Sequence, residues 1–154
     1  MEKRVVSGIT FSKNEAKLTL LSVKDKPGVA GIVFDCLSKA NIIVDMIIQN
    51  ISDNNLTDVT FSCPTDQVDM AKNSLESGKN KNILEYKKLD VDIEVSKISI
   101  VGIGMRSHSG IAQTMFKTLG DENINIKVIS TSEIKISVLI ERKYLELAVQ
   151  VLHE

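Results

Sequence analysis

The pattern of hydrophobic and polar residues in this chain occurs twice. In the first half, a short apolar run at 18–23 precedes a turn at 24–28. Val29, Val33 and Leu37 then recur at helical spacing, and a second apolar run follows at 42–48. Short apolar runs bounded by polar turns predict β-strands, and apolar residues three or four apart predict an amphipathic helix. The first half therefore begins strand, helix, strand.

The rest of the first half adds a strand, a helix and a final strand region. A turn at 53–55 precedes a strand at 56–63, and 83–95 contains one or two strands. Thr65 follows Pro64 and is expected to cap a second helix, which Gly78-Lys79-Asn80 is expected to end. The order strand, helix, strand, strand, helix, strand is that of a split βαββαβ unit.

The second half repeats this order but lacks its last strand. Strands are predicted at 98–103, 126–129 and 134–140, the last from an apolar residue at every second position, namely Ile134, Ile136, Val138 and Ile140. The predicted helix stripes are Ile111, Met115 and Leu119, and then Leu145, Ala148, Val149 and Leu152. An unassigned apolar segment at 4–11 is expected to supply the missing strand. The first module, 15–95, would then be inserted into the second, which combines 96–154 with strand 4–11.

The two halves also match residue by residue. The matched pairs are Gly28 with Gly110, Ala30 with Ala112, Phe34 with Phe116, Leu37 with Leu119, and Asn41-Ile42 with Asn123-Ile124. Two copies are too few for a solenoid. The predicted fold is α+β, with two ferredoxin-like βαββαβ modules packed side by side. This fold hosts many functions, so it does not decide the function by itself.

Composition and charge exclude several classes of function. The net charge is −1, which provides neither a basic field for nucleic acid nor a polybasic stripe for a membrane. No apolar run approaches the roughly 18 residues of a membrane span, and the N-terminus lacks a signal-peptide core. Cys36 and Cys63 have no metal-like spacing, so both are expected to be reduced thiols of a cytosolic protein.

Motifs for catalysis or for cofactors are weak. Gly102-Ile103-Gly104 lacks a third glycine at the dinucleotide spacing, and no phosphate-binding loop of the Gly-x4-Gly-Lys type occurs. His108 has no Asp or Cys close to it in the sequence, which favours a loop or ligand-edge role over catalysis. The sequence therefore predicts no catalytic residue, no metal site and no cofactor.

The loops that connect the first strand of each half to its helix are the candidate binding sites. They span 25–30 and 105–112, and each places a glycine near the start of a helix. First-turn N–H groups and the helix dipole can hold a carboxylate without a basic side chain. Asp25 and Gln49 could accept an α-ammonium group. One such loop alone would be read as an ordinary turn, whereas two at equivalent positions favour a site for a free amino acid.

Several longer runs resemble the tandem ACT domains at the C-terminal end of aspartate kinases. These runs are DKPGVAGIVFDCLSKANIIVDMIIQN, TDVTFSCP, VGIGMRSHSG and NINIKVISTSEIKISVLI. The resemblance extends from about Val5 to Glu154. It implies the regulatory part of an enzyme that phosphorylates the β-carboxylate of aspartate with ATP. In that family the ACT pair binds lysine, threonine or both and inhibits the kinase.

The resemblance also implies a set of effector-binding residues. Asp25, Gly28 and Ala30, with Lys26 and Val29 between them, match the effector loop, and Gln49 matches a strand residue of the same pocket. Asn125 and Ile126 match a backbone-contacting strand of the second unit across the interface. Ala112, Ser132 and Glu133 match positions that line the lysine side of the effector site. Met105, Ser107 and His108 border the same side. Ala112 lacks the hydroxyl of the Thr that some relatives carry, so no side-chain contact is predicted from it.

The family's kinase domain, with its ATP motif, is not matched by any part of this sequence. The chain is expected to be either an excised fragment or a regulatory subunit made from an internal start, and it needs no cofactor, because ATP belongs to the kinase domain. Implied partners are the aspartate kinase catalytic domain or subunit and a second copy of the chain, through the ACT sheets. The implied location is cytoplasmic. The alternative is a free-standing amino-acid-binding ACT regulator of another protein.

Overall fold

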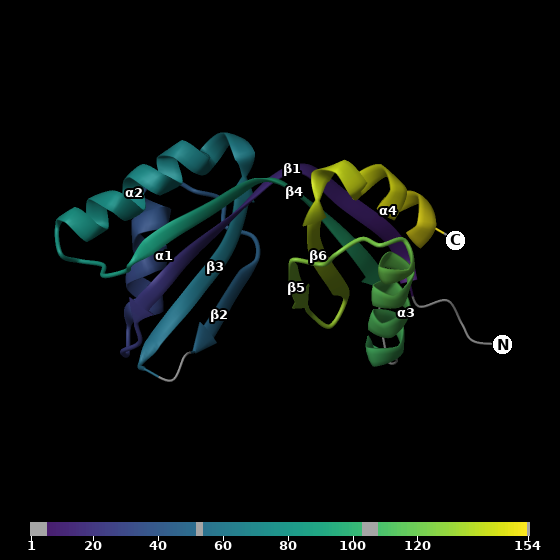
Figure 1. Cartoon of the computed structure of the whole chain (residues 1–154), viewed down its shortest axis with the longest axis horizontal. Coiled ribbons are helices and arrows are strands. Elements are labelled where there is room, and N and C mark those ends of the chain that lie inside the picture. The colour runs from purple at the N-terminus through teal and green to yellow at the C-terminus, as the bar shows by residue number, and fades with distance from the viewer. Residues whose placement is uncertain (1–5, 52–53, 103–107, 154) are drawn as a thin grey trace. The chain divides into compact units, whose positions relative to one another are not determined.

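The computed structural model describes residues 6–51, 54–102 and 108–153. The chain divides into two compact units (Figure 1). The first module is Glu15–Ile93, and the second module combines Glu94–Glu154 with the segment that ends at Asn14. The first module is thus inserted into the sequence of the second. Two long strands each begin in one module and end in the other.

The first module is a four-stranded antiparallel sheet with two helices on one face (Figure 1). The strands follow the order β2-β3-β1-β4 across the sheet. Its elements are the C-terminal part of β1 (Val6–Lys24), α1 (Val29–Lys39), β2 (Ile47–Ile51), β3 (Leu56–Pro64), η1 (Thr65–Gln67), α2 (Val68–Asn80) and the start of β4 (Lys88–Gly102). The predicted βαββαβ order is confirmed.

The second module repeats this plan with the order β1-β4-β6-β5. Its further elements are α3 (His108–Asp121), β5 (Val128–Thr131), β6 (Lys135–Glu141), η2 (Arg142–Tyr144) and α4 (Leu145–Leu152). The Arg142 guanidinium donates from Nε to the Lys13 carbonyl oxygen at 3.0 Å and from its terminal nitrogen to the Val95 carbonyl oxygen at 3.4 Å. Ser96 donates its hydroxyl to the same Lys13 oxygen at 2.7 Å. These bonds join β1 and β4 within the second module.

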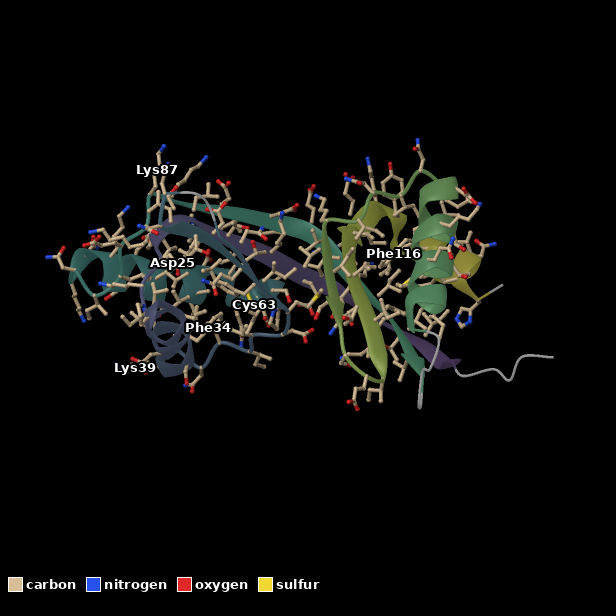
Figure 2. The ribbon with its side chains drawn as sticks, turned by 90° about the horizontal axis from the view of Figure 1, so that it is seen from below. Asp25, Phe34, Lys39, Cys63, Lys87 and Phe116 are labelled. Carbon is tan, nitrogen blue, oxygen red and sulfur yellow. The ribbon has the colours of Figure 1, made fainter. Side chains whose placement is uncertain are left out.

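Each module has its own hydrophobic core. Figure 2 labels Phe34 and Cys63 in the first module and Phe116 in the second. Phe34 of α1 meets the buried Phe61 of β3 edge to face, with ring centroids 6.3 Å apart. This geometry suits the aromatic quadrupoles and fixes α1 over the sheet.

Several local predictions differ from the structure, and the strands expected at 83–95 and 98–103 belong to one continuous strand, β4, which begins at Lys88. The expected strands 4–11 and 18–23 belong to one continuous strand, β1, which begins at Val6 within the described residues. The strand expected from Ile42 begins only at Ile47, because the Ile42 N–H is used to close the end of α1. Thr65 does not hold the N-cap position of α2, which falls on Gln67; it is the first residue of η1, and α2 starts three residues later.

Candidate functional site

The loop between β1 and α1 is shaped by a glycine in the left-handed region. Gly28 has φ 90° and ψ −7°, a conformation that strains residues with a Cβ atom. The Val29 N–H donates to the Lys26 carbonyl at 3.1 Å, and the Ile32 N–H donates to the Gly28 carbonyl at 3.1 Å. No side chain caps α1, so its first-turn N–H groups, at Ala30 among others, lie at an uncapped helix start. This is a geometry that can receive a carboxylate.

Asp25 lies beside the turn that joins β2 and β3. Its N–H donates to the Asn55 carbonyl at 2.7 Å, just beyond the pairing of Lys24 with Leu56. Asp25 is half-buried, whereas Lys26 and Gly28 are exposed. The start of α1 and the β2–β3 turn therefore share one end of the first module.

Gln49 lies on the side of the sheet that α1 covers. It pairs with Val59, and Ile47 of the same strand pairs with Phe61. Directly opposed residues point to the same face, and Val59 and Phe61 face the core beneath α1. Gln49 remains exposed because β2 is the edge strand. Gln49 thus lies on the α1 side of the sheet, on the edge strand β2, and β3 separates it from β1; its partner Val59 also pairs with Leu20, five residues before Asp25.

Val29 differs from its neighbours in this loop. Its side chain is buried in the first core, and its N–H is used by the bond to Lys26. It therefore supports the loop rather than offering a polar group.

The remaining predicted site residues lie in the second module. Ala112 is on α3 and packs against the second core. Asn125 and Ile126 precede β5, whereas Ser132 and Glu133 follow it, in the turn to β6. The second module therefore places these two pairs at opposite ends of β5. Ser132 is held in its turn by its N–H, which donates to the Lys135 carbonyl at 2.8 Å.

Met105 and Ser107 lie outside the described residues, as does the side chain of His108.

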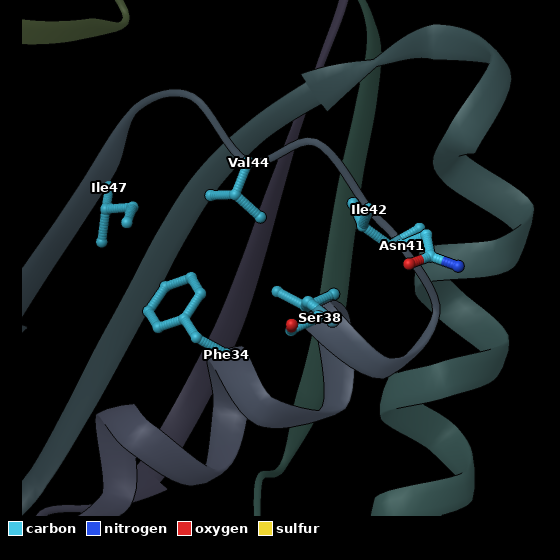
Figure 3. Close-up of a pocket in the computed structure, with 7 residues that line it drawn as sticks. Phe34, Ser38, Asn41, Ile42, Val44 and Ile47 are labelled. Atoms are coloured by element: carbon cyan, nitrogen blue, oxygen red, sulfur yellow. The ribbon is translucent and has the colours of Figure 1, made fainter.

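A hollow in the first module was not predicted from the sequence. It has a volume of about 510 Å³ and lies along the C-terminal half of α1 and the segment that leads into β2 (Figure 3). The residues that line it are Phe34, Leu37, Ser38, Asn41, Ile42, Val44 and Ile47. Its lining is mostly apolar, and none of the predicted effector residues contributes to it. Ile47, which is half-exposed, marks the open edge of this hollow in the structure. In the sequence it is one more apolar residue of a predicted strand, and such a residue does not reveal an open sheet edge.

The described residues contain no cluster of three or more His, Cys, Asp or Glu side chains arranged to hold a metal ion. Within the same ranges, every helix is too short or too polar to cross a bilayer.

Comparison with known proteins identifies the family. The model of the ACT domain matches residues 21–78 and 98–154, one copy in each half of the chain. The chain belongs to the ACT domain family.

Its relatives place this ACT pair in the regulatory part of aspartate kinases. The aspartate kinase of Pseudomonas fluorescens is 50% identical over 153 residues, which cover 99% of this chain and 37% of the relative. The chain thus spans little more than a third of the length of that curated relative. A crystal structure of aspartokinase alpha and beta subunits is 47% identical, with a TM-score of 0.86 and 96% of each chain covered.

A second solved structure supports the same assignment. The ligand-free regulatory subunit of aspartate kinase from Thermus thermophilus is 31% identical, with a TM-score of 0.88 and 97% of each chain covered. The family expected from the sequence is confirmed, and this ACT pair corresponds to the regulatory rather than the catalytic part.

Proposed function

We propose that this ACT pair binds a free amino acid, lysine or threonine or both, and thereby inhibits an aspartate kinase catalytic domain or subunit. One observation carries the proposal: the start of α1 at Gly28 is uncapped and follows Asp25 by three residues, and Gln49 lies on the side of the sheet that α1 covers. The enzyme that it would control transfers phosphate from ATP to aspartate. ATP would be bound by the kinase domain and not by this pair.

The groups at this site suit the two charges of an α-amino acid. The first-turn N–H groups of α1 and the helix dipole favour the α-carboxylate. The Asp25 carboxylate can accept from the α-ammonium, and the Gln49 amide can both donate and accept. The exposed ammonium of Lys26 adds positive charge beside the carboxylate position.

The second set of residues would distinguish the side chains of possible effectors. Glu133 offers a carboxylate to the ammonium of lysine, and Ser132 offers a hydroxyl. Ala112 offers no hydrogen bond to either effector. Asn125 and Ile126 would provide backbone contacts.

Inhibition requires that the effector bind one arrangement of the protein more tightly than another, since only this difference shifts an equilibrium. We propose that the chain forms a homodimer through its ACT sheets, and that this dimer has two arrangements with different affinity for the effector. Cys36 and Cys63 are free thiols, which suits the proposed cytoplasmic location.

Thermal unfolding with added amino acids tests the proposal. Lysine, threonine, methionine and aspartate are added separately and in pairs. A ligand at 100 times its dissociation constant stabilises the folded state by about 2.7 kcal/mol, which raises the melting temperature by roughly 5–10 °C. A shift with lysine or threonine alone is expected. No shift with any of the four contradicts the proposal.

Substitutions in the loop and in β2 then locate the site. Asp25→Ala and Gln49→Ala should each weaken binding about tenfold, since each removes a side chain proposed to hydrogen-bond a charged group of the amino acid. Asp35→Ala is the matched control, because Asp35 is an exposed carboxylate on α1 that pairs with Lys39. Equal affinity in all three variants would place the effector elsewhere.

A further inference from the structure

Strand β1 contains a bulge immediately before the effector loop. Leu20 pairs with Val59 and Val23 pairs with Thr57. Between these pairs β1 advances three residues while β3 advances two, so β1 carries one extra residue. Ser22 lies in this bulge with φ 58°, a left-handed conformation that is costly for a residue other than glycine.

The bulge decides which face Asp25 occupies. Before it, Leu18 and Leu20 face the core, whereas after it Val23 does. Side chains alternate along a strand, so one extra residue moves all later side chains to the opposite face. Asp25 directly follows β1, and its N–H donation to the Asn55 carbonyl continues the pairing of Lys24 with Leu56 by one residue, so the same alternation directs Asp25 to the face of Val23, the side of the sheet that Gln49 shares. Regular pairing would turn Asp25 to the other face of the sheet.

Two backbone groups of the bulge, the Ser22 N–H and the Leu21 carbonyl, have specific partners. The Ser22 N–H donates to Oδ1 of Asp58 on β3 at 3.0 Å. On the other side, the Lys87 N–H donates to the Leu21 carbonyl at 2.9 Å. A bulge interrupts the ladder of backbone bonds, and the Asp58 carboxylate replaces the bond that Ser22 would otherwise make to the neighbouring strand.

We propose that Asp58 is a positioning residue for effector binding: its carboxylate holds the bulge at Ser22 and so directs Asp25 to the effector side of the sheet. The expected effect on effector affinity rests on the proposed function. The role of Asp58 in holding the bulge does not depend on it. Asp58 acts through Ser22 and the direction of β1, not by contact with the effector.

Four variants of the full chain test this role. Asp58→Ala removes the acceptor, and Asp58→Asn keeps Oδ1 as an acceptor. Thr60→Ala is the control, because Thr60 lies two residues further along β3 and makes a 3.0 Å hydroxyl bond to Thr19 across the same two strands. Ser22→Gly combined with Asp58→Ala lowers the cost of the left-handed backbone and should restore the bulge without the carboxylate.

The first readout is the affinity for L-lysine and L-threonine, measured by calorimetry. Asp58→Ala is expected to weaken binding on the order of tenfold, since it removes a hydrogen bond to a charged acceptor. Asp58→Asn and Thr60→Ala should remain within about threefold of the original chain, and Ser22→Gly should recover most of the loss. Native affinity in Asp58→Ala, or an equal loss in Thr60→Ala, overturns the proposal.

The second readout needs no effector and separates the two hypotheses. Cross-strand nuclear Overhauser contacts report whether Thr57 lies opposite Val23, as with the bulge, or opposite Ser22, as without it. Asp58→Ala is expected to shift or weaken the Val23 contacts and to accelerate exchange of the Ser22 amide. An unchanged bulge in Asp58→Ala refutes the positioning role. If the original chain binds neither amino acid but loses the bulge in this variant, the proposed function fails and the role of Asp58 in directing Asp25 stands.

Discussion

Asn41 and Asn123 end equivalent helices with the same left-handed turn. Their φ angles are 58° and 62°. After each of them, the N–H of the next isoleucine donates to a leucine carbonyl five residues back, Ile42 to Leu37 at 3.0 Å and Ile124 to Leu119 at 2.9 Å. This six-to-one bond defines a Schellman motif. The internal repeat therefore preserves the way in which each helix stops, together with the apolar residue that follows.

Substitution of these asparagines should test the importance of the helix ends. Asn41→Ala and Asn123→Ala are each expected to lower the free energy of unfolding by about 1 kcal/mol, because alanine tolerates the left-handed region poorly. The matched variants Asn41→Gly and Asn123→Gly should be neutral or stabilising. Urea unfolding measures the difference. Equal stability of the alanine and glycine variants would show that the φ angle does not matter.

Gly78 allows α2 to approach α1 closely. A Cβ atom at this position would lie 3.1 Å from Cys36 Sγ and 3.5 Å from Leu84 Cβ. Gly78→Ala should therefore destabilise the first module by about 1 kcal/mol through overpacking, despite the better helix propensity of alanine.

A double-mutant cycle isolates this contact. In a Cys36→Ala background the sulfur is absent, so Gly78→Ala should become neutral or stabilising by a few tenths of a kcal/mol. Urea unfolding of the four proteins gives the coupling energy. Additive effects would mean that the Cys36 sulfur does not determine the need for glycine.

Cys63 should make stability fall at alkaline pH. Its thiol is fully buried, and burial, followed by the nearby Glu15 and Asp66 carboxylates, raises its pKa from 9.0 to about 11. The folded state thus keeps the proton while the unfolded state loses it between these values, so the stabilisation is complete below pH 9 and is lost as the pH rises towards 11. The expected loss is roughly 1–3 kcal/mol across this range.

Chemical unfolding at a series of alkaline pH values measures this effect. Cys63→Ala should remove that part of the pH dependence, whereas Cys36→Ala should keep it. A pH dependence that is unchanged in Cys63→Ala would assign it to other groups.

The N-terminal strand segment should be required by the second module. Ile9 packs against the second core, and the first part of β1, from Val6, belongs to the second module. Deletion of residues 1–12 is expected to lower the stability of the second module by several kcal/mol, since it removes a sheet strand and buried apolar area. Ile9→Ala is the milder control, which keeps the strand. Amide resonances from each module during urea unfolding give the result, and an unchanged second module would refute the prediction.

Most of the fold could be predicted because the relevant patterns are local. The spacing of Val29, Val33 and Leu37 gave α1, and the alternation at 134–140 gave β6. The start of β2 and the continuity of β1 could not be predicted, because both depend on which backbone groups pair at a distance. The candidate loop was visible from Gly28, yet the sequence does not show that Ser22 and Asp58 set the direction of Asp25.

The sequence by itself determined the two ACT modules, their order of elements and the family, because periodicity and repeated motifs are properties of neighbouring residues. Only the tertiary structure decided that Val23, at the end of β1, and Gln49 on β2 lie on the face of the first sheet that α1 covers. The physical reason is that one extra residue in β1 reverses the alternation of side chains, and this register is fixed by pairing with β3, more than thirty residues away in the sequence.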